Sequence, residues 1–161
     1  MLKYQINPPT KMLIGLISDT HGMMRPEALR ALSGVDLVLH AGDVGAPAVL
    51  DALRAIAPVY AVRGNVDQEE GELRAAIDLQ LDGARMHLSH GHELGSPTPT
   101  ALAARYDADV IVYGHTHRAL IKQVGSTLVI NPGAAGAARF RLQPSIGLLT
   151  LPAREAKIVL L

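Results

Sequence analysis

Short apolar runs alternate with amphipathic segments along the first half of the chain. The runs at 12–18, 36–41 and 58–63 are rich in Val, Ile and Leu, which predicts strands that are covered on both faces. Between these runs, the segments 25–33 and 46–56 repeat apolar residues at helical spacing. Each of them carries a proline near its start, so we expect a helix in each. The first half therefore predicts the order β-α-β-α-β.

The second half changes to the alternating pattern of antiparallel strands. Alternation on both sides of Asp82–Gly83 predicts a hairpin of two strands over 77–81 and 86–88. The remaining predicted elements are a helix that starts near Thr98 or Pro99, a strand over 109–113, and hairpins over 121–130 and 146–161. Parallel β-α-β units followed by hairpins predict an α/β fold with a mixed two-sheet core and helices outside.

The length of the chain favours a single domain. Its 161 residues fit one core, which we place at 12–161 after a short N-terminal extension of residues 1–11. The extension is polar and lacks the apolar core of a secretory signal. No later run approaches the about 18 apolar residues of a membrane span. We therefore expect a cytoplasmic protein without a membrane partner.

Charge and cysteine content narrow the chemistry. Fifteen basic and fifteen acidic residues cancel, so no global field attracts the protein to nucleic acid or to an anionic membrane. The chain has no cysteine, which excludes disulfides, thiolate nucleophiles and thiolate metal ligands. Any metal chemistry must therefore come from His, Asp and Asn.

Residues that can bind metals stand at the ends of five predicted strands. Five of these residues end the apolar runs, and two further His stand two positions after Asp19 and after His115. The whole set is Asp19, His21, Asp43, Asn65, His90, His115 and His117. In open α/β folds, ligands that follow strand ends converge on one edge of the sheet. Taken singly, Asp43 and Asn65 could be turn residues, since each follows a glycine. Their joint occurrence at five strand ends favours a metal site.

The number of candidates favours two ions over one. Seven ligands exceed the needs of a tetrahedral site but suit two ions about 3.5 to 4 Å apart with a bridging carboxylate. Imidazole ligands favour Mn, Fe, Co, Ni or Zn over Mg and Ca. Two divalent ions, two Asp carboxylates and one hydroxide leave a net charge of about +1, which attracts an anion. The expected nucleophile is the metal-bound hydroxide.

Six short motifs carry a family resemblance: SDTHG at 18–22, HAGDVG at 40–45, RGNVD at 63–67, SHGHE at 89–93, YGHTHR at 113–118 and NPGAAG at 131–136. In this order they resemble the calcineurin-like metallophosphoesterases, and the short chain is similar to their compact bacterial and archaeal phosphodiesterase branch. The resemblance covers nearly the whole chain from Met12. It implies a four-layer αββα sandwich, in which two mixed β-sheets pack face to face with helices outside.

The resemblance also implies a ligand set. One ion would be held by Asp19, His21 and His117, the other by Asn65, His90 and His115, and Asp43 would bridge them. The implied cofactors are two divalent transition-metal ions, first of all Mn²⁺, with Fe, Zn, Ni and Co as alternatives. The implied reaction is hydrolysis of phosphate esters without a covalent intermediate.

One position departs from the family pattern. Larger members carry a His directly after the Asn of the RGN motif, where it is thought to protonate the leaving oxygen, but this chain has Val66. Valine cannot donate a proton, and a missing general acid costs about 10² to 10⁴ in rate for poor leaving groups. His92 is the candidate substitute, and a second reading makes it a support for the ligand His90. We count Asn65, His92 and Asp67 as candidate catalytic residues.

Other polar residues near the motifs receive supporting roles. His40 ends a buried strand and is expected to form a hydrogen bond near Asp43. His87 alternates with Met86 and Leu88 and is expected to face solvent. Arg63 and Arg118 flank ligands and suit either phosphate contact or charge balance, so neither is placed among the catalytic residues.

The sequence thus predicts a metal-dependent phosphodiesterase that acts on a small phosphate ester, with nucleic acid only as a possible substrate. A phosphomonoesterase of the same fold is the alternative enzyme. A protein-interaction scaffold is the alternative of another class, since relatives of the compact branch serve as assembly subunits of membrane-coat complexes. Those relatives have lost at least one essential ligand, whereas this chain keeps all seven positions, which favours catalysis. The oligomeric state is not predicted.

Overall fold

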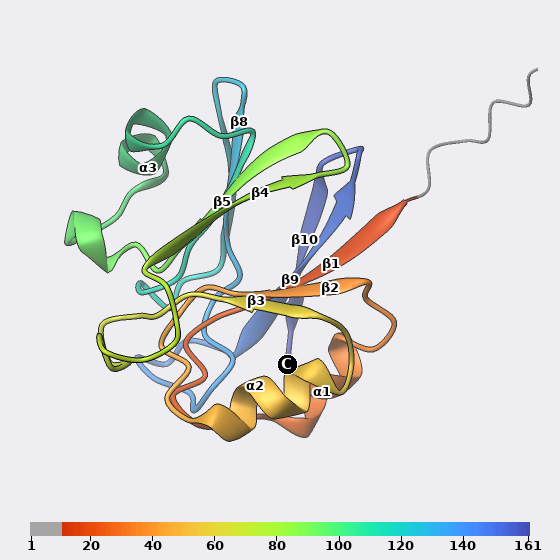
Figure 1. Ribbon diagram of the computed structural model, residues 1–161, viewed down its shortest axis with the longest axis vertical. Coiled ribbons are helices and arrows are strands. Elements are labelled where there is room, and N and C mark those ends of the chain that lie inside the picture. The colour runs from red at the N-terminus through yellow and green to blue at the C-terminus, as the bar shows by residue number, and fades with distance from the viewer. Residues whose placement is uncertain (1–10) are drawn as a thin grey trace, which may run out of the picture.

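The computed structural model describes residues 11–161 (Figure 1). The predicted N-terminal extension, residues 1–11, lies outside the described residues except for Lys11. Within the described residues, no helix is long and apolar enough to cross a membrane.

The first sheet combines parallel and antiparallel pairing. Its five strands have the order β10-β9-β1-β2-β3. The central strand β1 pairs parallel to β2, which pairs parallel to β3, while β9 pairs antiparallel to both β1 and β10. The bounds are β1 (Met12–Ile17), β2 (Leu37–His40), β3 (Val59–Ala61), β9 (Ser145–Leu151) and β10 (Glu155–Leu160).

The second sheet is mixed as well, with the order β4-β5-β6-β8-β7. The hairpins β4-β5 and β7-β8 are antiparallel, and β6 joins them by parallel pairing with β5 and β8. The bounds are β4 (Ala76–Leu81), β5 (Ala84–Ser89), β6 (Val110–Val112), β7 (Leu120–Val124) and β8 (Thr127–Asn131).

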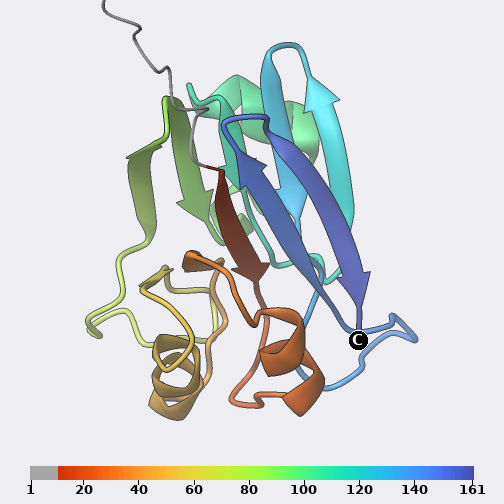
Figure 2. The ribbon, with the colours of Figure 1, turned by 90° about the vertical axis from the view of Figure 1, so that its right-hand side faces the viewer.

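Within residues 11–161, three short α-helices and one 3₁₀ helix complete the structure. They are α1 (Pro26–Ala31), α2 (Pro47–Arg54), α3 (Pro99–Arg105) and the 3₁₀ helix η1 (His92–Leu94). Figure 1 shows α1 and α2 together against the first sheet and α3 beside the second sheet. Figure 2 shows the two sheets from the side, with their strands facing one another.

Alternating side chains divide the molecule into layers. On β1, Ile14 and Leu16 are buried in the core between the two sheets, whereas Leu13 and Ile17 pack with apolar residues of α1 and α2. The same alternation occurs in the second sheet, where the inner side chains pack against the first sheet and the outer ones pack against Leu102 of α3. Because a strand turns successive side chains to opposite faces, these apolar runs fill the space on both sides of each sheet. The layers are therefore α1 and α2, the first sheet, the second sheet and α3.

The structure confirms the predicted α/β sandwich and most element positions. The hairpin turn at Asp82–Gly83 and the helix start at Pro99 lie where the pattern predicts them. The strand predicted over 58–63 is shorter, because Val62 leaves the ladder and bridges to Arg74 instead. The 3₁₀ helix η1 carries no apolar periodicity, and the sequence analysis did not predict it.

Candidate metal centre

The predicted ligands occupy the loops that follow the C-terminal ends of the strands. Asp19 and His21 follow β1, Asp43 follows β2, and Asn65 lies beyond β3. The remaining ligands follow the second sheet, with His90 after β5 and the pair His115 and His117 after β6. Because both sheets end at the same side of the sandwich here, segments far apart in the sequence meet at one site.

The backbone at this site is unusual. A positive φ angle is uncommon for residues other than glycine, and such strain clusters at functional sites. Among the described residues, nine non-glycine residues have one, and five of these are predicted ligands. Those five are Asp19 (φ 53°), His21 (47°), Asp43 (53°), His115 (68°) and His117 (60°). These turns aim the side chains at a common point.

Glycine allows the loops to approach one another. A Cβ atom at Gly64 would collide with the Asp43 carboxylate, and one at Gly114 would collide with Ser18 and Asp19. Each glycine directly precedes a predicted ligand, so RGN can pack against HAGD, and YGHTH against SDTHG, only without a side chain at these positions.

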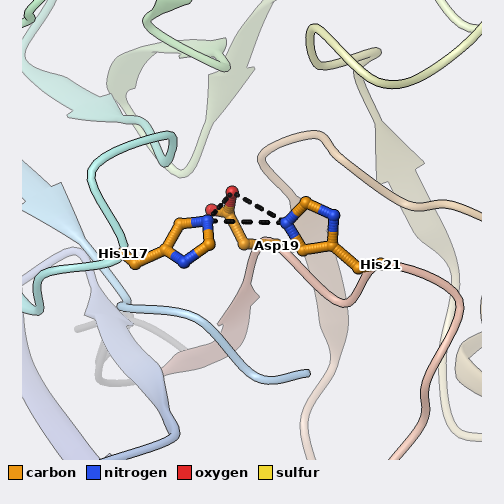
Figure 3. Close-up of side chains that lie close together, drawn as sticks. All are labelled: Asp19, His21 and His117. Atoms are coloured by element: carbon orange, nitrogen blue, oxygen red, sulfur yellow. Dashed lines mark hydrogen bonds and ion pairs between the residues drawn. The ribbon is translucent and has the colours of Figure 1, made fainter. Parts of the chain in front are cut away.

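Asp19, His21 and His117 form the first group of ligands (Figure 3). Asp19 Oδ1 lies 3.1 Å from His117 Nε2 and 3.8 Å from His21 Nε2, and the two imidazole nitrogens are 3.4 Å apart. Asp19 Oδ2 accepts hydrogen bonds from Ser18 Oγ (2.6 Å) and the His115 N–H (3.2 Å). Asp19 Oδ1 is buried and accepts no hydrogen bond within the described residues. A buried carboxylate oxygen without a donor is costly, and a cation between these three side chains would satisfy it.

The second group joins Asp43 and His90 to Asn65 and His115. Asp43 Oδ2 lies 3.3 Å from His90 Nε2, and Asn65 Oδ1 lies 3.1 Å from both His90 Nε2 and His115 Nδ1. Asp43 Oδ2 is also 3.7 Å from His21 of the first group. Asp19 Oδ1 reaches across in the same way, 3.9 Å from His90 Nε2. Each carboxylate therefore lies near both groups. Bridging of two metal ions by Asp43 stays a prediction, and Asp19 is a second candidate for the bridging ligand.

Hydrogen bonds fix the tautomers of two buried histidines. His90 Nδ1 lies 2.7 Å from the carbonyl oxygen of Ala41 and donates to it, which turns Nε2 toward the site. The Gly42 N–H donates to His40 Nδ1 (3.2 Å), so His40 Nε2 carries the proton and donates to Thr20 Oγ1 (2.9 Å). Burial lowers the pKa of His40 to about 4, so its ring stays neutral. The predicted supporting role of His40 is confirmed, through the backbone next to Asp43.

The electrostatics of the site favour a bound positive charge. Burial alone would raise the pKa of Asp43, but hydrogen bonds from His90 and from the Val66 N–H lower it to about 2. Burial alone would lower the pKa of His90, but the Asp43 carboxylate and the charge of Asp19 raise it above its ordinary value. Both shifts show that the two carboxylates favour positive charge at this point, which a bound metal cation would supply.

Comparison with known proteins identifies the family. The model of the calcineurin-like phosphoesterase superfamily domain matches residues 12–154. The chain belongs to this superfamily. A probable metallophosphoesterase of Methanothermobacter thermautotrophicus is 36% identical over 151 residues, which cover 87% of this chain and 86% of that protein.

Two solved structures share the fold. A novel archaeal phosphodiesterase superposes with a TM-score of 0.78 at 27% identity, covering 93% of this chain and 100% of that chain. Vps29 of Entamoeba histolytica, solved as the wild-type protein in complex with zinc, superposes with a TM-score of 0.74 at 29% identity, covering 93% and 98%. The superfamily fold is therefore found both in a phosphodiesterase and in Vps29.

In this metallophosphoesterase domain, Asp67 holds the loops together. Its carboxylate accepts hydrogen bonds from the backbone N–H groups of Gly64 (2.8 Å), Val44 (3.1 Å) and Gly45 (3.0 Å). It therefore ties the loop after β3 to the loop after β2, which together carry Asn65 and Asp43. These contacts describe a positioning residue, and a direct catalytic role for Asp67 stays a prediction.

A cavity opens beside the second ligand group. It measures about 420 Å³ and is bordered by Asn65, His92, Glu93 and Tyr106 among others. The His92 ring centroid lies 5.3 Å from that of His90 and 6.2 Å from that of His115. His92 thus stands where the cavity meets the ligands, and its role as proton donor stays a prediction.

Sequence reasoning missed two residues of this cavity. Tyr106 follows α3 and donates a hydrogen bond to Glu93 Oε1 (2.9 Å), while Glu93 Oε2 accepts one from the Gly91 N–H (2.9 Å). Burial and this bond to Glu93 raise the pKa of Tyr106 to about 12. Tyr106 lies outside every family motif, so only the packing of α3 brings it to the site.

The flanking arginines differ in what they contact. Arg63 donates from Nη1 to the carbonyl oxygen of Glu69 (3.0 Å), which holds the loop over 68–74 at the edge of the cavity. Arg118 is exposed. The segment Gln68 to Arg74 is largely exposed and borders this cavity, as its position after Asn65 predicts.

The expected exposure of His87 is wrong. Its side chain is buried, stacks on Tyr106 with ring centroids 3.7 Å apart, and places Nδ1 2.8 Å from Asp78 Oδ1. The alternation correctly turns His87 away from the core between the sheets. However, Tyr106, which directly follows α3, covers this outer face, so the side chain meets protein and not solvent.

Proposed function

We propose that this protein is a metal-dependent phosphodiesterase. One observation carries the proposal: all seven ligand-type side chains converge into two adjacent groups, linked by carboxylates that reach both. The names of related proteins, a probable metallophosphoesterase and an archaeal phosphodiesterase, support the same class. The substrate would be a small phosphate ester.

The donor set fits two divalent transition-metal ions, and Mn²⁺ is our first candidate. Asp19, His21 and His117 would hold one ion, and Asn65, His90 and His115 the other, with a shared carboxylate between them. When bound, such ions polarise phosphoryl oxygens and activate water for attack. The imidazole nitrogens favour such ions over Mg²⁺ and Ca²⁺, which prefer oxygen ligands, while the carboxylate oxygens of Asp19 and Asp43 also suit Mn²⁺.

Side chains of the protein would determine which leaving groups the enzyme can protonate and release. Val66 is exposed and contributes only its backbone N–H, which donates to Asp43. His92 is the side chain at the cavity border that can exchange a proton with a leaving oxygen. Without a dedicated acid at position 66, the enzyme would act best on activated esters.

A protein-interaction scaffold is the second candidate, favoured by the similarity to Vps29. That structure binds zinc, so metal binding alone does not distinguish the two functions. Metal binding likewise does not distinguish a phosphodiesterase from a phosphomonoesterase, which is the alternative enzyme. Turnover of a defined diester separates these possibilities.

The test combines metal analysis with turnover. Chelator-treated protein is titrated calorimetrically with Mn²⁺ and assayed with bis-p-nitrophenyl phosphate. We expect about two ions per chain and diester hydrolysis, and in Asp43→Asn a loss of both. Asp51→Ala, on the exposed face of α2, is the matched control. Wild-type protein that binds no metal and hydrolyses no ester, or a fully active Asp43→Asn variant, would overturn the proposal.

A further inference from the structure

The loop between β8 and β9 runs past the first ligand group. The Ser145 N–H donates to the Ala134 carbonyl oxygen (3.1 Å) and closes the loop at its base. The Ala135 and Gly136 N–H groups donate to the carbonyl oxygens of Ser18 (2.9 Å) and Asp19 (3.2 Å). Figure 2 shows this light blue loop at the end of the sheets toward which β1 points, beside α1. The loop is therefore anchored to the backbone of a predicted ligand.

The tip of this loop is strained. The Leu142 N–H donates to the Arg139 carbonyl oxygen (2.9 Å), and the two residues inside this turn, Phe140 and Arg141, have φ angles of +55° and +57°. Turns with two left-handed residues favour Asn and Gly. A bulky aromatic residue in this conformation is an outlier, and such outliers are typical of ligand clamps.

The strained turn presents an aromatic ring beside the metal centre. Phe140 is the only phenylalanine of the chain, and 78% of its surface is exposed. Its ring centroid lies 5.9 Å from that of His117, in an edge arrangement. Exposure of most of the phenyl ring forgoes the stabilisation that burial would give, and it leaves the ring free to contact a ligand.

The two sides of the metal centre therefore differ. The cavity bordered by His92, Glu93 and Tyr106 lies beside Asn65 and the second ligand group, whereas Phe140 and Arg139 lie beside the first. Burial lowers the pKa of His21, and the nearby positive charge of Arg139 lowers it further. A phosphodiester carries two ester groups, and this site offers each of them a different surface.

We propose that Phe140 is a stacking surface for a planar aromatic group of the substrate, so that the enzyme selects phosphodiesters carrying a nucleobase or another aromatic ester group. The proposal rests on the proposed phosphodiesterase function. Stacking of a base on an exposed aromatic side chain strengthens binding by about tenfold or more. The charge of Arg139 adds attraction for the phosphate.

Binding without turnover gives the first test. The chain has no tryptophan, so Phe140→Trp places a single fluorophore at the proposed surface. We expect saturable quenching of its emission by adenosine 5′-monophosphate and little change with ribose 5-phosphate, which carries the same phosphate without a base. The control is Ala153→Trp, in the exposed β9-β10 turn at the opposite end of β1. Equal responses to both ligands, or the same response in the control, would refute stacking at Phe140.

Kinetics give the second test and separate the two proposals. Phe140→Ala should raise the KM for bis-p-nitrophenyl phosphate by about tenfold, with kcat changed less than about twofold, and Phe140→Trp should restore the KM. The KM for glycerophosphocholine, which has no aromatic group, should not change. An inactive wild-type protein would count against the proposed function, whereas the fluorescence titration would still test stacking. An active enzyme whose KM is insensitive to Phe140→Ala, or rises equally for both substrates, would contradict the stacking proposal alone.

Discussion

Acidification should destabilise this protein through His40. The ring is completely buried, and burial lowers its pKa from 6.5 to about 4 in the folded state. The unfolded chain therefore binds a proton at a higher pH than the folded one. The stability that the neutral His40 ring contributes is fully present above pH 6.5 and is lost as the pH falls from 6.5 toward 4. The two pKa values correspond to a loss of about 2 kcal/mol by pH 5 and about 3 kcal/mol by pH 4.

The hydrogen bonds of His40 explain why the folded protein resists protonation. Nδ1 accepts from the Gly42 N–H, and Nε2–H donates to Thr20 Oγ1, which in turn donates to the carbonyl oxygen of Val44 (2.9 Å). A proton on Nδ1 would place two hydrogens against each other and break the first of these bonds. The chain of bonds therefore requires the neutral ring.

The assay compares wild-type protein with His40→Gln, which cannot titrate but can still donate to Thr20. Urea unfolding is followed by circular dichroism between pH 7 and pH 5, with chelator present throughout so that metal binding does not contribute. The variant should be less stable at pH 7, since the Gly42 N–H loses its acceptor. Its free energy of unfolding should fall by about 2 kcal/mol less than that of the wild type over this range. If the free energies of unfolding of the two proteins fell by the same amount between pH 7 and pH 5, the role assigned to His40 would be refuted.

Two further predictions concern the support of the ligands. Ser18→Ala removes the 2.6 Å hydrogen bond to Asp19 Oδ2 and should weaken Mn²⁺ binding by about tenfold, measured by calorimetric titration; unchanged affinity would show that the backbone alone orients Asp19. Asp67→Ala leaves three backbone N–H groups without their acceptor and should lower the free energy of unfolding by about 2 kcal/mol. Urea unfolding beside Asp51→Ala measures this loss, and equal stability of the two variants would contradict it.

The fold could be predicted because its apolar periodicity is regular. The central strands of both sheets are covered on each face, so they appear as apolar runs whose odd and even positions fill different layers. Turn residues such as Asp82–Gly83 then mark where hairpins reverse. The 3₁₀ helix at 92–94 escaped prediction because three residues are too few to show a period.

The convergence of the candidate ligands could be predicted for a related reason. A ligand that follows a strand end is placed by the strand itself, so its position in the sequence carries its position in space. His87 shows where this logic stops, because alternation gives the side of the sheet but not what covers that side. Tyr106 covers it, and the docking of α3 is a tertiary contact that local pattern does not encode.

The position of Phe140 beside the candidate site could not be predicted from the sequence either. No motif includes it, and a phenylalanine between two arginines in a loop has no periodicity to interpret. Its place depends on hydrogen bonds from Ala135 and Gly136 to the β1 loop, contacts between segments more than a hundred residues apart. Metal ligands are constrained by chemistry to a few residue types, whereas a substrate surface can be built from many. The sequence therefore identifies the candidate metal centre, and the loops beside it would decide which ester the proposed enzyme accepts.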